Sequence, residues 1–311
     1  MTDYTGTMTA TAAEPTGGQY ALRHGDQQVV VTEVGAGLRS YTVGDWAVLD
    51  GYRADELCTA GRGQMLIPWP NRVEDGRYRF GGAEHQLALT EPAAGNAIHG
   101  LTRWSNWTAA KQDQAILRMH HTLHAQPGWP FVLGCELEFT LDDSGLAVRT
   151  TVTNLGAGPC PYASGAHPYL SVGTPLVDTA RLRLPARTRY LSDQRGIPVG
   201  REPVPGGGMD GLIGPQRLDT AFTDLVRDAD GLVRVRLSAP AGPEVTLWAD
   251  EAYRWIQVFT GDGVPEPSRR RTGLAVEPMT APPNALRTGE GLVTLRPGER
   301  HSARWGIRPV R

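Results

Sequence analysis

One glutamate and two histidines stand in segments whose neighbours favour acid–base chemistry. Glu277 ends an apolar run and precedes a proline in AVEPM, so its carboxyl group enters a partly desolvated setting. Desolvation raises the pKa of a carboxyl group and makes its carboxylate a better base. His167 precedes a proline in GAHPYL and could act as a general acid or base, and His99 precedes a glycine in NAIHGL, where a ligand can approach the backbone. Each residue alone has an ordinary alternative, namely a surface glutamate or a buried, hydrogen-bonded histidine.

A further segment, PWPNR, combines a stiff backbone with polar side chains. Two prolines bracket Trp69, and Asn71 and Arg72 follow at once. An amide and a guanidinium on a rigid support suit the recognition of hydroxyl groups on a polyol. The alternative is a proline-rich corner with Trp69 in the core and Arg72 in a surface ion pair.

Two other clusters of polar residues have weaker support. His120, His121 and His124 form H-H-x-x-H, and on a helix the first and last would share a face and could bind zinc. The flanking ILRMHHTL alternates as a strand does, however, and the sequence names no third ligand for a zinc hydrolase. The basic triplet at 269–271 is either a solvated surface or a contact for a phosphate or sulfonate.

The composition argues against several classes of protein. The 311 residues include 31 Lys+Arg and 33 Asp+Glu, a net charge of −2, so no nucleic-acid surface is expected. No P-loop, dinucleotide-binding glycine motif or G-x-S-x-G is present, so nucleotide binding and serine-hydrolase chemistry lack sequence support. No apolar run approaches the roughly 20 residues of a membrane-spanning helix, so no membrane contact is expected.

The cysteine count and the first residues bear on compartment and domain limits. Three cysteines do not make a disulfide framework and favour a reducing compartment. Residues 1–18 are small and polar, without the basic and apolar regions of a secretory signal, and predict a flexible tail. We therefore expect a cytoplasmic protein with one domain over residues 19–311, present as a monomer or weak homodimer.

Period-two alternation dominates the chain and predicts strands. Residues 135–154 alternate on both sides of Asp-Asp-Ser-Gly, which predicts a β-hairpin, and residues 77–87 and 233–250 repeat the pattern. Residues 253–260 and 273–278 are further strand-like runs, whereas convincing amphipathic helices are absent. Many short strands with frequent turns favour an all-β sandwich or barrel.

Five segments taken together resemble the aldose 1-epimerase family, also called galactose mutarotase-like proteins. They are PWPNR at 68–72, NAIHGL at 96–101, GAHPYL at 165–170, LDTAFTDL at 218–225 and AVEPMTAPPNA at 275–285. They occur in the order that the family shows, and the resemblance extends from about residue 29 to about residue 309. It implies a large single-domain β-sandwich with the sugar held in a cleft on one sheet, in agreement with the period-two pattern.

The resemblance also implies a role for each matching residue. Glu277 matches the general base of the family and His167 its general acid. The other matches bind the sugar: His99, Arg72, Asp219, Asn71 and Trp69. Asp224 lies in the same segment as Asp219 and is the alternative acidic residue.

The implied reaction interconverts the α and β anomers of an aldohexose. A base removes the proton of the C1 hydroxyl while an acid protonates the ring oxygen, the C1–O5 bond breaks, the aldehyde rotates, and the ring closes on its other face. Because nothing is oxidised or hydrolysed, no cofactor and no metal are expected. The sugar stays open among neutral, phosphorylated and sulfonated hexoses, and a non-catalytic carbohydrate-binding β-sandwich is the alternative of a different class.

Overall fold

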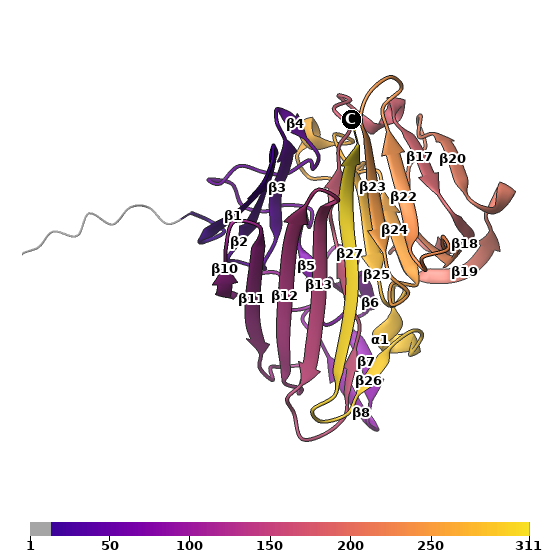
Figure 1. The fold of residues 1–311 in the computed structure, drawn as a ribbon. Helices are drawn as coiled ribbons and strands as arrows, with labels where there is room; N and C mark the ends of the chain where they lie inside the picture. Colours follow the sequence, from indigo (N-terminus) through magenta and orange to yellow (C-terminus); the bar gives the residue numbers. More distant parts are fainter. Residues whose placement is uncertain (1–13, 311) are drawn as a thin grey trace, which may run out of the picture.

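The alternating segments form antiparallel strands in the computed structural model, which describes residues 14–310 (Figure 1). The predicted hairpin is confirmed: β12 (Leu133–Asp142) and β13 (Gly145–Asn154) pair along their full length around the Asp-Asp-Ser-Gly turn. Every second residue of β12 is buried, because successive side chains of a strand point to opposite faces of the sheet. The same alternation therefore specifies both the strand and the face that packs inward.

A nine-stranded antiparallel sheet forms one side of the molecule. Its strand order is β10-β11-β12-β13-β27-β23-β22-β17-β20 (Figure 1). Besides β12 and β13, its strands are β10 (Thr108–Gln112), β11 (Ile116–Leu123), β27 (Arg300–Val310), β23 (Glu244–Ala249), β22 (Val233–Ser238), β17 (Arg181–Leu184) and β20 (Met209–Leu212).

An eight-stranded sheet carries the residues of greatest interest. Its strand order is β19-β18-β21-β24-β25-β15-β5, with β16 also paired to β25. These strands are β19 (Pro198–Pro203), β18 (Ala186–Ser192), β21 (Asp219–Leu225), β24 (Trp255–Phe259), β25 (Leu274–Met279), β15 (Gly165–Ala166), β5 (Met65–Leu66) and β16 (Tyr169–Leu170). All six residues of β25 are buried, because this strand has neighbours on both sides and is covered on both faces.

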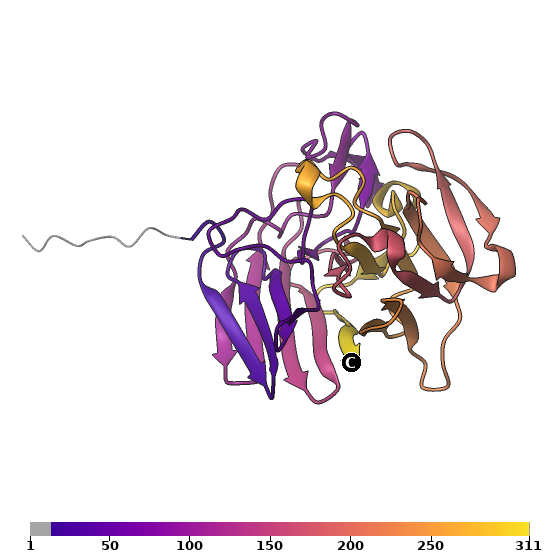
Figure 2. The same ribbon diagram turned by 90° about the horizontal axis from the view of Figure 1, so that it is seen from above.

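Smaller elements complete the described chain. A four-stranded sheet comprises β1 (Gln19–His24), β2 (Gln27–Thr32), β3 (Leu38–Val43) and β4 (Trp46–Ala47), and it lies beside the nine-stranded sheet (Figure 2). Three strand pairs are β6 (Arg72–Glu74) with β9 (Asn96–Ile98), β7 (Arg77–Phe80) with β8 (Ala83–Gln86), and β14 (Cys160–Tyr162) with β26 (Val293–Leu295). The helical turns are η1 (Val177–Thr179), η2 (Pro205–Gly207), η3 (Pro267–Arg269) and α1 (Ala285–Thr288). Within residues 14–310, none of these helices has the length and apolar character needed to cross a membrane.

One apolar core joins the two large sheets. Phe139 and Trp305 from the nine-stranded sheet belong to the same buried cluster as Phe222 and Val276 from the eight-stranded sheet. The predicted all-β, single-domain architecture is therefore confirmed. The cysteines contribute to the interior as unpaired thiols, in line with their odd number: Cys58, Cys135 and Cys160.

The packed part of the chain begins before the end of the predicted tail. Thr16 is 1% exposed, and its carbonyl oxygen accepts a hydrogen bond from the backbone N–H of Val34 at 3.0 Å. Residues 14–18 therefore pack against the domain, and residues 1–13 lie outside the described residues.

Candidate active site

A buried glutamate–histidine pair lies in a pocket of about 350 Å³ on the eight-stranded sheet. Glu277, on β25, is 2% exposed and stands directly opposite Gln257 of β24. His167 lies in the short connection between β15 and β16, and its Nε2 atom is 3.3 Å from Oε1 of Glu277. Oε2 of Glu277 has no hydrogen-bond partner among the described residues, so this oxygen can accept a proton from a ligand.

Burial sets the protonation of this pair. It raises the pKa of Glu277 well above its ordinary value, and the charge of Asp219 adds to the effect. Burial also lowers the pKa of His167 to about 3, with the cations Arg103 and Arg62 acting in the same direction. An ordinary histidine titrates near neutrality, whereas His167 departs from this because the residue is only 5% exposed. Burial therefore favours the neutral form of both groups, with the proton on the carboxyl group of Glu277 and an uncharged imidazole at His167.

The tautomer of the second histidine follows from its backbone contacts. The backbone N–H of Asn71 donates to Nδ1 of His99 at 3.1 Å, and the N–H of His99 donates to the carbonyl oxygen of Asn71 at 2.9 Å. Both residues have left-handed backbones, with φ of 53° and 63°. Burial and the neighbouring His167 hold the pKa of His99 well below its ordinary value. The ring is therefore neutral with its proton on Nε2, and it serves the pocket as a hydrogen-bond donor.

The same three side chains meet the distance requirement of a metal site. Ligand atoms of His99, His167 and Glu277 lie within 4.8 Å of one another, and two histidines with one carboxylate are a common donor set for iron. A metal at Nε2 of His99 would require the ring proton on Nδ1, where it would point at the N–H of Asn71. Because that hydrogen bond holds Nε2 in its protonated form, the three residues do not fit a metal ion.

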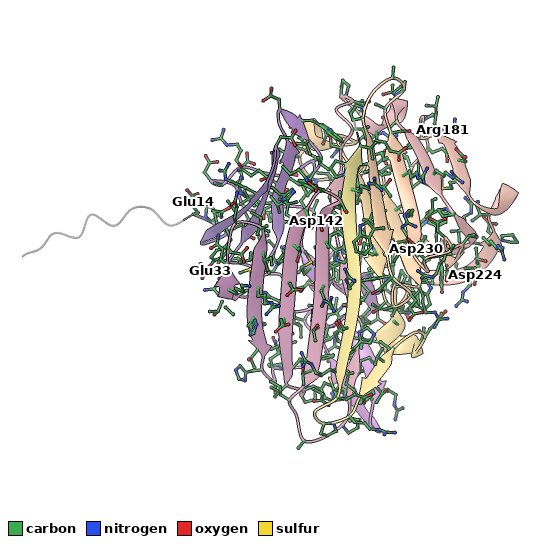
Figure 3. All side chains as sticks on the ribbon, in the orientation of Figure 1. Glu14, Glu33, Asp142, Arg181, Asp224 and Asp230 are labelled. Atoms are coloured by element: carbon green, nitrogen blue, oxygen red, sulfur yellow. The ribbon has the colours of Figure 1, made fainter. Side chains whose placement is uncertain are left out.

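A polar network closes one side of the pocket. The guanidinium of Arg72 donates to both oxygens of Glu91, at 2.9 and 3.1 Å, and to Asp219 at 3.3 Å. The other oxygen of Asp219 accepts from the amide of Gln257 at 2.5 Å. The carboxylate of Asp219 and the guanidinium thus hold each other in place at the pocket. The alternative acidic residue, Asp224, is exposed at the rim of the molecule, where it accepts a hydrogen bond from a threonine hydroxyl (Figure 3).

A stack of side chains fixes the plane of the His167 ring. The ring of Tyr169 lies parallel to it, with centroids 5.1 Å apart, and the guanidinium of Arg62 covers the Tyr169 ring at 4.7 Å. Arg62 is 1% exposed and pairs with Asp50 at 3.3 Å. On another side, a Cβ at Gly61 would lie 2.9 Å from the imidazole, so only glycine fits there.

The structure brings six of the seven residues expected from the sequence to one pocket. They are Glu277, His167, His99, Arg72, Asp219 and Asn71. Trp69 is not brought there. Its indole is 2% exposed and packs in the core, 6.0 Å from the ring of Trp129. The prolines around Trp69 thus hold an interior side chain, and the residue next to them, Asn71, reaches the pocket.

Two adjacent residues at the pocket were missed from the sequence. Trp104 is 53% exposed and lines the pocket, together with Arg103. Arg103 makes no ion pair in the described chain and donates instead to the side-chain oxygen of Gln64 and the carbonyl of Ile98, both at 3.2 Å. Both residues come shortly after NAIHGL, in TRW at 102–104, so a polar–aromatic pair close to a predicted ligand histidine was the available signal.

The two weaker clusters have structural partners elsewhere. His120 and His121 lie on β11, where the first is 3.2 Å from Glu136 and the second bonds to the backbone carbonyl of Asn106 at 3.0 Å. With His124 they form no group within metal-binding distance among the described residues. The basic triplet is largely bound within the protein, since Arg269 pairs with an aspartate at 2.7 Å.

Comparisons with known proteins agree with this fold. The sequence model of the aldose 1-epimerase family matches residues 18–308. The chain is 31% identical over 296 residues to the uncharacterized protein YihR of Escherichia coli (strain K12), covering 94% of each chain. It is 21% identical over 309 residues to the uncharacterized protein YphB of the same strain, covering 93% of this chain and 98% of that protein.

Solved structures show the same architecture. The GalM/aldose epimerase homologue from C. elegans superposes with a TM-score of 0.83 at 16% identity, covering 94% of this chain and 99% of that chain. Galactose 1-epimerase from Lactobacillus acidophilus gives a TM-score of 0.76 at 18% identity, covering 93% of both chains. The chain therefore belongs to the aldose 1-epimerase family.

Proposed function

We propose that the protein is a mutarotase that interconverts the α and β anomers of an aldohexose. The observation that carries this proposal is the buried pair of His167 and Glu277, whose facing atoms lie 3.3 Å apart at the pocket. Ring opening needs one group that takes a proton from the C1 hydroxyl and one that gives a proton to the ring oxygen. Membership in the aldose 1-epimerase family supports the same reaction.

Burial favours the form with the proton on Glu277, so the proposed reaction first passes this proton to His167, which leaves Glu277 as the carboxylate. Glu277 removes the proton of the C1 hydroxyl while His167 protonates the ring oxygen. The C1–O5 bond breaks with its electron pair going to the ring oxygen, and the C1–O1 bond becomes the carbonyl of the aldehyde. After rotation about C1–C2, the same two groups return the protons in the reverse sense and the ring closes on its other face. Each half of the reaction moves two protons, one to the pair and one from it, so the pair ends with the same number of protons as it began with.

The remaining pocket residues would bind and orient the sugar. The Nε2–H of His99 is a fixed donor for an acceptor oxygen such as the ring oxygen. Arg72 and Asp219 offer donors and an acceptor for the other hydroxyl groups. Trp104 provides an exposed aromatic face at the pocket on which the C–H face of a sugar can pack.

The test is NMR exchange between the anomeric protons of several aldoses with and without the protein. The panel comprises glucose, galactose, a hexose 6-phosphate and sulfoquinovose. The proposal predicts faster exchange for at least one sugar. Binding of a sugar without any acceleration across the panel would instead support a non-catalytic carbohydrate-binding protein.

A second candidate, a mutarotase for an anionic sugar, is favoured by Arg103. This guanidinium lines the pocket without a carboxylate partner in the described chain, and its Nε has no hydrogen-bond partner. A cation withdrawn from water without a counterion is costly, so an anionic group on the substrate would compensate it. In the same assay, Arg103→Gln should slow exchange of the phosphorylated or sulfonated sugar and leave that of the neutral sugars unchanged.

A further inference from the structure

The carboxylate of Asp50 joins two segments that are far apart in the sequence. Its side chain is 15% exposed and accepts hydrogen bonds from two guanidinium groups, those of Arg62 at 3.3 Å and Arg269 at 2.7 Å. The hydroxyl of Thr272 donates to the same carboxylate at 2.9 Å. Because Arg62 and Arg269 are 207 residues apart, this one carboxylate fastens together two distant parts of the chain.

The first segment, residues 58–62, leads from the pocket wall to His167. Three residues of this segment line the pocket. The guanidinium of Arg62 covers the ring of Tyr169, which is stacked on the ring of His167. The backbone N–H of Asp50 donates to the carbonyl oxygen of Tyr169 at 2.9 Å. Asp50 therefore holds Tyr169 in two ways, directly through the backbone and indirectly through Arg62.

The second segment is the loop that contains the basic triplet and whose residues 263–265 line the pocket. Arg269 fastens this loop to Asp50, whereas Arg271 fastens it to Asp178 at 2.9 Å. Two arginines of the triplet are therefore anchors of the pocket wall. Among the described residues, only the carboxylate at Asp50 also bonds to the first segment.

Close packing fixes Asp50 against the strand that carries Glu277. A Cβ at Gly273 would lie 2.6 Å from the Cβ of Asp50, so the chain can approach this closely only with glycine there. Gly273 directly precedes β25, on which Glu277 lies. Asp50 is thus in contact with the start of this strand and, through Tyr169, with the stack behind His167, although it does not line the pocket itself.

We propose that Asp50 is a positioning residue, which holds the ring of His167 and the pocket wall at 263–265 in a fixed relation to each other. The inference rests on the proposed mutarotase activity. Proton delivery to the ring oxygen requires the imidazole to keep its distance and direction toward the bound sugar. Because Asp50 does not line the pocket, its loss should slow this step more than it weakens sugar binding.

The test compares Asp50→Asn with two control variants. Asparagine keeps the shape of the side chain, but it removes the charge and replaces one acceptor oxygen with an amide donor. Asp178→Asn removes the other anchor of the loop, and Val148→Ala destabilises the core from β13 of the nine-stranded sheet, where Val148 is buried. Arg269→Gln, which takes one partner from Asp50, is the second test variant and decides the matter if Asp50→Asn does not fold.

Three quantities are measured for each variant. The anomeric exchange assay gives kcat and KM for the sugar that the wild type accelerates best. Urea unfolding gives the stability. NMR spectra of protein with isotope-labelled histidine follow the ring of His167, whose signal is identified by its loss in His167→Asn.

Asp50→Asn should lower kcat by about tenfold while KM stays within about threefold of the wild-type value. It should also shift or broaden the His167 signal but not that of the exposed His124. Arg269→Gln should act in the same direction on both readouts. Both control variants should keep kcat within about twofold of wild type, with an unchanged His167 signal.

A wild-type kcat in Asp50→Asn, or in Arg269→Gln if the first variant does not fold, would overturn the inference. An equal fall in kcat in Val148→Ala at the same loss of stability would overturn it too, because Asp50 would then act on stability alone. If the wild type accelerates no sugar, the proposed function is refuted. The NMR comparison still decides on the positioning, since an unchanged His167 signal in Asp50→Asn would contradict it.

Discussion

Glu277→Gln tests whether the folded protein carries a proton on this carboxyl group. In the unfolded chain the carboxyl ionises around its ordinary pKa of 4.5, whereas the buried group keeps its proton well above that pH. Because the folded state then binds one more proton, Glu277 lowers the free energy of unfolding by about 1.4 kcal/mol for each pH unit above 4.5. This loss continues until the pH reaches the raised pKa of the folded state. Glutamine has no titrating group and removes the dependence.

The two buried histidines act with the opposite sign. His99 and His167 are neutral in the folded state, and burial lowers the pKa of His167 to about 3. Above the ordinary histidine pKa of 6.5, both histidines contribute fully to the free energy of unfolding. As the pH falls below 6.5 toward the pKa values of the folded state, each histidine loses about 1.4 kcal/mol of this contribution per pH unit. Between pH 4.5 and 6.5, the pH dependence of stability that Glu277 causes therefore offsets that of one of the two histidines in the wild type.

Urea unfolding at several pH values measures this balance. Relative to wild type, Glu277→Gln should become more stable as the pH rises above 4.5, by about 1.4 kcal/mol per pH unit until the pH reaches the raised pKa of Glu277. His167→Asn should change by a similar slope in the opposite direction. Glu84→Gln, at an exposed position, is the control and should run parallel to wild type. A parallel curve for Glu277→Gln would refute the reasoning, because Glu277 would then ionise alike in both states.

Substitutions at four further positions separate the effects of positioning, binding and packing. Arg62→Met leaves Asp50 without one partner and removes the guanidinium that covers Tyr169, the ring stacked on His167. We expect Tm to fall by about 5 °C and kcat by about tenfold, with partial recovery in Arg62→Lys. Calorimetry measures the change in Tm, and the anomeric exchange assay measures the change in kcat. Trp104→Ala should weaken sugar binding about fivefold in a titration, because Trp104 lines the pocket. Trp69→Phe, a substitution in the core, should lower stability with little effect on sugar affinity. Weaker sugar binding in Trp69→Phe but not in Trp104→Ala would contradict the places assigned to the two residues. Gly100→Ala should lower the free energy of unfolding, measured in urea, by about 3 kcal/mol or more, because φ of Gly100 is 73° and an added Cβ would lie 2.1 Å from a backbone oxygen. Wild-type stability of this variant would count against this backbone geometry.

Local sequence patterns predicted the strands because burial on one face imposes a period of two. The hairpin of β12 and β13 follows from alternation on both sides of a turn signal. The order of strands in the sheets does not follow in this way. β25 lies between β24, which is near in sequence, and β15, which is more than 100 residues away, and this pairing depends on packing of the whole core.

The site was predictable in its residue types but not in its electrostatics. Glu277 and His167 could be named from their segments, yet the low pKa of the histidine depends on complete burial, which no local pattern shows. The tautomer of His99 depends on a reciprocal backbone contact with Asn71, 28 residues away. Trp69 was placed at the ligand because it belongs to the same segment as Asn71 and Arg72, but its indole packs in the core.

The most direct test of the proposed mechanism measures anomeric exchange for Glu277→Gln and His167→Asn on the sugar that the wild type accelerates best. Glu84→Gln and His124→Asn are matched controls, because both positions are exposed and lie outside the pocket. Loss of one proton-transfer group predicts a fall in kcat of about 100-fold or more in each site variant, with sugar binding retained and both controls at the wild-type rate. A wild-type rate in either folded site variant would contradict the assignment of these two residues as the acid–base pair.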